Sequence, residues 1–183
     1  MTTEESRTRH TATATPRRVR SRRAMRHDGR RLILIDVENL LGCEPRDADA
    51  ALFEVAIEGV LARVAFRAGT DQVVIGACPQ SAVKVFGVRA PHRLVVREGA
   101  SGADRALVAA AADHDHTAAR FDEVVIASGD REFLETAVQL RARGVRTTVA
   151  SRADALNGSV RIVADEVVAL DSARELGGLA LAA

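Results

Sequence analysis

The sequence predicts an α/β fold, a three-layer domain with a central parallel sheet of five or six strands. Short apolar runs of strand length recur along the chain without alternating polar residues, which is typical of strands buried on both faces. Segments with the apolar spacing of helices separate these runs. Alternating strands and helices of this kind build parallel sheets covered by helices on both sides.

The elements follow one another in a regular order. Strands are predicted at 32–37, 72–77, 93–97, 123–128 and 145–150, with a short sixth strand at 167–170. Helices are predicted at 47–68, near 80–87, at 103–120 and at 131–143. Gly69 and Gly144 stand where the first and last of these helices are expected to end.

Length and composition indicate one globular domain, expected at 31–171. The chain has 183 residues, of which 47% are hydrophobic and 28% charged. Its apolar runs fall short of the roughly 18 residues that a membrane helix needs, and charges near the start argue against a signal peptide. Cys43 and Cys78 lack zinc-site spacing and are expected to be reduced thiols. We therefore expect a cytoplasmic protein with no membrane partner.

Charge is distributed unevenly along the chain. Residues 1–31 hold ten arginines and three acidic residues, whereas the remainder holds 16 basic and 22 acidic residues. We expect 1–30 to be a disordered basic tail and 172–183 a C-terminal tail. The run at 17–23, RRVRSRR, suits non-specific phosphate binding. A merely solvated tail, or a true start at Met25, are the alternatives.

Carboxylates follow three of the predicted strands. In an open parallel sheet, ligands bind beyond the carboxyl ends of the strands, where the strand order reverses. Carboxylates gathered there would suit a hard divalent ion, Mg²⁺ or Mn²⁺, which can activate water and neutralise charge on a phosphodiester. The polar residues at these three tips are Asp36, Asn39, Asp104, Ser128, Asp130 and Glu132.

Helix capping is the structural alternative for two of these acids. Asp130 stands where a helix begins and suits an N-cap. Asp104 follows Ser101 by three residues, which matches a capping box. Asp36 closes an apolar strand, where a carboxylate contributes nothing to burial. The coincidence of acids at three strand tips favours a site.

Three segments resemble the NYN domain, a branch of the PIN-like nuclease superfamily. LILIDVENLLG is similar to its first strand with the Asp-x-x-Asn motif, and SGADRALVAAAAD to its Gly-x-Asp segment. VVIASGDREFLETAVQLRARGVRTTVAS resembles its strand–SGDxDF–helix–strand unit. The resemblance covers roughly 31–152.

The resemblance implies a Rossmann-like, PIN-like fold and metal-dependent endoribonuclease activity on RNA. Asp36, Asp104 and Asp130 would hold Mg²⁺ or Mn²⁺, with Asn39 as a companion polar residue and Ser128 shaping the site. Three positions depart from the family pattern, namely Val37, Ala110 and Glu132. A catalytically weak or inactive RNA-binding or regulatory module is the alternative function, and formation of a homo-oligomer is left open.

Other candidate residues have equally ordinary explanations. The run 113–116, Asp-His-Asp-His, is expected to be a solvated helix end, and Cys78 has no recognisable histidine partner. Five Phe without Trp or Tyr leave little for base stacking. P-loop and dinucleotide-binding motifs do not occur. Four arginines near the strand tips suit phosphate binding or an ordinary surface: Arg97, Arg105, Arg131 and Arg152.

Overall fold

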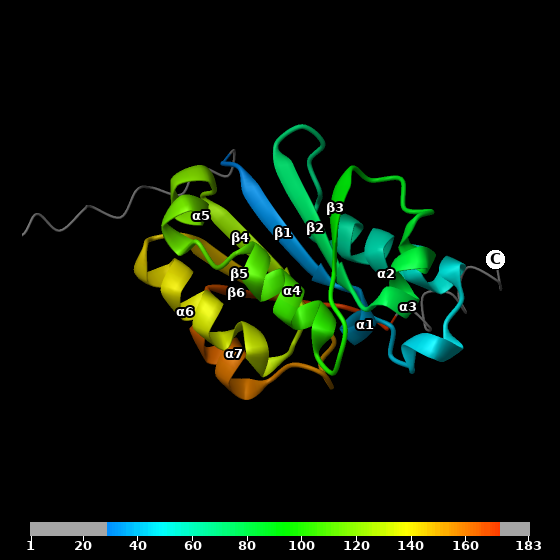
Figure 1. Cartoon of the computed structure of the whole chain (residues 1–183). Helices are drawn as coiled ribbons and strands as arrows, with labels where there is room; N and C mark the ends of the chain where they lie inside the picture. Colours follow the sequence, from blue (N-terminus) through cyan, green and yellow to red (C-terminus); the bar gives the residue numbers. More distant parts are fainter. Residues whose placement is uncertain (1–28, 173–183) are drawn as a thin grey trace, which may run out of the picture.

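The computed structural model describes residues 29–172, which form a six-stranded parallel sheet with the order β3-β2-β1-β4-β5-β6 (Figure 1). The strands are β1 (Arg31–Asp36), β2 (Asp71–Ala77), β3 (His92–Val96), β4 (Glu123–Ala127), β5 (Arg146–Ser151) and β6 (Glu166–Ala169). Every neighbouring pair is parallel, so the predicted fold class is confirmed. The expected tails at 1–30 and 172–183, and Met25, lie almost entirely outside the described residues.

Helices cover both faces of the sheet (Figure 1). Odd-numbered residues of β1, such as Ile33 and Ile35, pack in one core with α2, while Leu32 and Leu34 pack in a second core with α4 and α6. Both sets of side chains are buried, which explains the unbroken apolar runs. The helices are α1 (Val37–Leu40), α2 (Ala50–Arg63), α3 (Pro79–Ala82), α4 (Gly102–Ala110), α5 (His114–Arg120), α6 (Leu134–Ala142) and α7 (Gly158–Val163), with 3₁₀ turns η1 (Pro45–Asp47), η2 (Val83–Val85) and η3 (Arg131–Phe133).

The predicted helix at 47–68 is too long. Helix α2 ends at Arg63, because the chain turns at Ala65, whose φ of 49° lies in the left-handed region. The guanidinium of Arg31 donates to the carbonyl oxygens of Val64 (2.9 Å) and Ala65 (2.8 Å) and holds this turn. Gly69 lies in the following loop rather than at the helix end.

The predicted helix at 103–120 is two helices. Helix α4 ends at Ala110, and α5 begins after Asp113, whose side chain accepts a hydrogen bond from the backbone N–H of His116 (2.8 Å). The run 113–116 therefore starts a helix instead of ending one. Helix α7 has no counterpart among the predicted elements.

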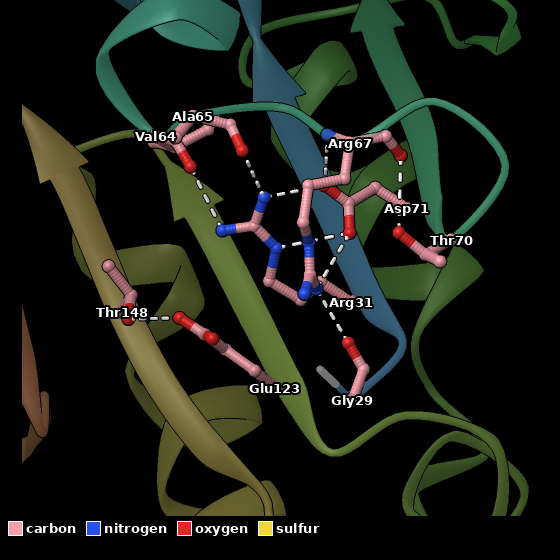
Figure 2. A network of polar contacts seen from close by, with 9 residues as sticks. All are labelled: Gly29, Arg31, Val64, Ala65, Arg67, Thr70, Asp71, Glu123 and Thr148. Atoms are coloured by element: carbon pink, nitrogen blue, oxygen red, sulfur yellow. Dashed lines mark hydrogen bonds and ion pairs between the residues drawn. The ribbon is translucent and has the colours of Figure 1, made fainter. Parts of the chain in front are cut away.

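A network of hydrogen bonds and ion pairs surrounds Asp71 at the N-terminal ends of the strands and stabilises the beginning of the domain (Figure 2). The Asp71 carboxylate accepts from Arg31 Nη2 (2.5 Å) and Nε (3.1 Å) and from the backbone N–H of Arg67 (2.8 Å). Arg67 also donates to the carbonyl of Gly29 (2.6 Å). The network thus joins β1, β2 and the turn after α2.

The strand order reverses between β1 and β4. From β1 the chain proceeds outward to β2 and β3, and from β4 it proceeds outward to β5 and β6 on the other side. Because all strands are parallel, their carboxyl ends share one edge, and the crevice for a ligand lies where β1 and β4 diverge. Within residues 29–172, no helix is long and apolar enough to cross a bilayer.

Candidate active site

Asp36 ends β1 at this crevice and is almost completely buried, with 3% of its surface exposed. Its carboxylate accepts a hydrogen bond from the hydroxyl of Ser128 (3.0 Å), which follows β4, and a long one from the backbone N–H of Asn39 (3.4 Å). Strands β1 and β4 are therefore joined at their tips through a buried polar contact.

Asp104 reaches the same place from the first turn of α4, and it is also buried. Two glycines allow this helix to lie close to the sheet. A Cβ on Gly76 would stand 2.6 Å from the Leu107 side chain, and a Cβ on Gly102 would stand 2.2 Å from the carbonyl oxygen of Arg97. Larger residues at either position would push α4 away. The close packing brings Asp104 over the end of β1.

The carboxyl groups of Asp36 and Asp104 lie close enough for each to shift the pKa of the other. Burial raises the pKa of Asp36 well above its usual range, and the neighbouring Asp104 raises it further. Burial also raises the pKa of Asp104, and the negative charges of Asp130, Glu132 and Glu38 add to the effect. Two such carboxyls retain a proton between them unless a cation lies nearby.

The alternative that Asp104 forms a capping box with Ser101 does not hold. Ser101 has a left-handed backbone (φ 54°), and its side chain makes no capping hydrogen bond. Asp104 points inward to Asp36 instead. Its Oδ1 atom is buried and has no hydrogen-bond partner within the described part of the chain. Such an atom is costly unless a ligand satisfies it.

Asp130 lies at the rim of the pair and caps a helix as well. Its carboxylate accepts from the backbone N–H of Glu132 (2.9 Å), so the predicted N-cap is confirmed. Its own N–H donates to the Ser128 hydroxyl (3.2 Å). Glu132 is exposed. Asp130 and Glu132 therefore add negative charge beside Asp104 without contacting Asp36.

Asn39 holds the loop that carries Asp130. Its side-chain oxygen accepts from the backbone N–H of Gly129 (3.3 Å), whose carbonyl accepts from the N–H of Asn157 (2.9 Å). A Cβ on Gly129 would stand 2.2 Å from the carbonyl oxygen of Ala155, so only glycine fits there. Asn39 thus positions the loop after β4.

Glu38 belongs to the site although the sequence did not indicate it. Its carboxylate accepts from the backbone N–H of Cys78 (2.7 Å), which follows β2, and its charge acts on Asp104. The contact spans two strand tips far apart in sequence, so no local spacing announces it. The sequence feature that could have indicated Glu38 is its position between the two motif residues Asp36 and Asn39.

Of the four arginines expected near the strand tips, Arg152 is committed to the protein itself. Its Nη1 donates to the carbonyl of Asn39 (3.0 Å), and Nε pairs with Asp154 (3.1 Å). Arg97, Arg105 and Arg131 are exposed, and in residues 29–172 their guanidinium groups have no ion pair or hydrogen bond. Cys78 contacts the Ser81 hydroxyl (3.3 Å), with no histidine beside it.

The donor set of the site fits a hard divalent ion held by few protein ligands. Within residues 29–172 no three acidic, histidine or cysteine side chains are gathered closely enough to hold a metal, so the expected triad is not preassembled. Mg²⁺ commonly takes one or two carboxylates and completes its shell with waters and substrate phosphate. The buried pair and the unpartnered Asp104 Oδ1 supply that kind of site.

Comparison with known proteins identifies the domain. Residues 30–171 match the model of the NYN domain family, which lies within the PIN-like superfamily. The chain belongs to the NYN domain family. Its fold is similar to the crystal structure of a protein of unknown function from Vibrio parahaemolyticus, with a TM-score of 0.52 and 22% identity over 80% of this chain and 96% of that one. No curated protein matches the chain.

Membership of the NYN domain family implies RNA as the substrate, and the nucleases of this family typically use divalent metals. The segments that carry the resemblance contribute Asp36, Asp104 and Asp130. In this NYN domain, two of these acids are the buried residues Asp36 and Asp104, and the charge of Asp130 acts on Asp104.

Proposed function

We propose that this NYN domain is a metal-dependent endoribonuclease that cleaves RNA phosphodiester bonds beside Asp36 and Asp104. The observation that carries the proposal is the buried carboxyl pair at the reversal point of the sheet, with one Asp104 oxygen unpartnered. A protein retains two adjacent buried carboxyls at a cost to its stability, which favours a functional reason for them.

In this proposal, some residues of the site bind the metal ion and others fix the orientation of those that do. Asp36 and Asp104 would hold Mg²⁺ or Mn²⁺, and Asp130, whose negative charge acts on Asp104, would contribute through water. When bound, such an ion activates water and neutralises charge that develops on the phosphodiester. The Ser128 hydroxyl and the Asn39 N–H fix the orientation of Asp36. The Asn39 side chain holds the Gly129 peptide and with it Asp130.

Cleavage of labelled single-stranded RNA, with Mg²⁺, Mn²⁺ or EDTA, tests this proposal. We expect cleavage with a divalent ion, none in EDTA, and a loss of at least about a hundredfold in Asp36→Asn and Asp104→Asn. Asp130→Asn should also abolish cleavage while folding is retained, because the amide oxygen of Asn can still cap the helix. Asp47→Asn is the matched control, since Asp47 is exposed and pairs only with exposed Arg46.

An RNA-binding or regulatory role without cleavage is the second candidate. The observation that favours it is that, within residues 29–172, acidic, histidine and cysteine side chains do not gather into a group of three that could hold a metal. Wild-type protein that binds RNA yet leaves it uncut with both ions would establish this role and refute the nuclease. Cleavage that survives in Asp104→Asn would also refute the proposed site.

A further inference from the structure

One edge of the sheet has a charge unlike that of the rest of the domain. No acidic residue occurs in the sequence between Asp71 and Glu98, although acids outnumber bases beyond residue 31. We call residues 83–97, which comprise η2, the following loop and the edge strand β3, the β3 edge. Arg89, Arg93 and Arg97 lie along it.

These three arginines are not used to hold the fold. All are exposed, and within residues 29–172 their guanidinium groups make no ion pair, hydrogen bond or ring contact. Side chains alternate along a strand, so Arg93 and Arg97 share one face of β3. By contrast, Lys84 donates to the carbonyl oxygens of Pro45 (2.8 Å) and Ala48 (2.6 Å) and is structural.

The β3 edge also carries an exposed aromatic ring. Phe86 is 78% exposed, whereas Phe53, Phe121 and Phe133 are buried and Phe66 packs partly against the core. Phe86 and the three arginines thus belong to one short segment of the chain. An exposed ring and unpaired arginines on one segment suit single-stranded nucleic acid, because any base can stack on the ring while phosphates meet the cations.

The β3 edge leads directly to the carboxyl pair. Arg97 ends it, and the Arg97 carbonyl lies against Gly102, the first residue of the helix that carries Asp104. Arg105, on the same turn, is exposed and likewise makes no side-chain contact among the described residues. A single-stranded nucleic acid that binds along the β3 edge would therefore reach the Asp36–Asp104 pair.

The opposite edge of the sheet has the reverse character. Near β6, Arg141 pairs with Asp165, Arg146 with Glu166 and Arg152 with Asp154, so the cations there are neutralised. Little positive charge is left on that side to attract a polyanion. Arg161, on α7, is an exception, since it is exposed and its side chain has no partner in the described chain.

We propose that the β3 edge is the docking track for single-stranded RNA. Its phosphates bind Arg89, Arg93 and Arg97, and one base stacks on Phe86. The proposal deepens the proposed function and rests on it for the identity of the polymer. It assigns the direction of approach: RNA reaches Asp104 across β3 and not across β6.

Binding of fluorescein-labelled oligouridylate to the full chain, measured by anisotropy in EDTA at several salt concentrations, tests the track without cleavage. Each phosphate contact on a single strand adds about 0.7 to the slope of log affinity against log salt. Replacing Arg89, Arg93 and Arg97 by Gln should therefore weaken binding and reduce the slope by about 2. Phe86→Ala should weaken binding by about fivefold to a hundredfold with the slope unchanged.

Arg161→Gln and Ile162→Ala are the matched controls, since both residues are exposed on α7, and Ile162 is 80% exposed. Both should bind like the wild type, and thermal melts should show every variant folded. An unchanged slope in the triple variant, or equal losses in the controls, would overturn the track. So would light scattering that shows a wild-type dimer dissociated by Phe86→Ala, because the edge would then join two copies.

The outcomes separate this inference from the proposed function. Wild-type protein that binds along the β3 edge but never cuts RNA refutes the nuclease and supports the track. Protein that cuts RNA in an Asp104-dependent way, with binding indifferent to the three arginines, supports the nuclease and refutes the track.

Discussion

Asp36 at the end of β1 and Asp104 on the first turn of α4 are both buried, and each carboxyl group shifts the pKa of the other. This arrangement of two buried carboxyl groups does not stabilise the folded protein. The pair is stable only while it retains a proton or faces a cation. Metal binding should consequently be visible in the stability of the protein.

The first prediction concerns that stability. Mg²⁺ or Mn²⁺ should raise the free energy of unfolding of the wild type, by about 2.7 kcal/mol when the ion is a hundredfold above its Kd. Asp104→Asn should lose this response. In EDTA the same variant should exceed the wild type by about 1 kcal/mol, because one of the opposed carboxyls is gone. Urea unfolding with and without the ion measures both, and an equal response of the two proteins would contradict the pair as a metal site.

The second prediction concerns the loop after β4. Gly129→Ala should destabilise the protein by about 2–3 kcal/mol and lower RNA cleavage, because the added methyl meets the carbonyl oxygen of Ala155 and displaces the Asp130 loop. Gly158→Ala is the control. Apart from the adjoining backbone, nothing in the described chain lies within 4 Å of a Cβ placed on Gly158. The change should therefore be neutral or stabilise the protein by up to about 1 kcal/mol. Chemical denaturation of both variants measures the free energy of unfolding. Similar losses of stability in the two variants would argue against the close packing at Gly129.

The third prediction is a pH dependence at the opposite end of the sheet. Burial alone would raise the pKa of Asp71, but hydrogen bonds from Arg31 and Arg67 together outweigh burial and lower it. A carboxylate with a lowered folded-state pKa stabilises the protein above its unfolded pKa, and this contribution is lost as pH falls through the folded pKa. Asp71→Asn should therefore cost about 3 kcal/mol at pH 7, and progressively less below about pH 4.

Urea unfolding between pH 7 and pH 3 measures this difference. Asp47→Asn, which breaks only the exposed pair with Arg46, should change stability by less than about 1 kcal/mol across the range. A deficit in Asp71→Asn that stays constant down to pH 3 would show that the carboxylate charge is not what stabilises the wild type.

The sequence was sufficient for the sheet because buried strands announce themselves as apolar runs. It was also sufficient for the acids at the strand tips, since parallel strands end at one edge. It failed at the Ala-rich segment, where the helical pattern continues through Ala112 and hides the break that Asp113 creates by capping α5. Continuous helix propensity does not reveal a cap whose hydrogen bond ends one helix and starts another.

Within the site, the sequence could not distinguish a capping acid from a functional one. Asp130 is both a cap and a neighbour of the pair, whereas Asp104 is free of capping because Ser101 takes a left-handed conformation. Helix α4 also packs closely against β2 and β3 at Gly76 and Gly102, and such tertiary packing has no local sequence signal. Glu38 was missed for a related reason, since its partner at Cys78 is brought near only by the pairing of β1 with β2.

Strand β1 carries Arg31 at one end and Asp36 at the other, and its side chains alternate between faces. If β1 slipped by a single residue during folding, its whole side-chain set would turn over. Asp71 would then lose its ion pair with Arg31, at the same moment as Asp36 turned away from Ser128. A misaligned chain thus loses stability at the far end of the strand, and the Arg31–Asp71 pair favours the register in which Asp36 faces Ser128.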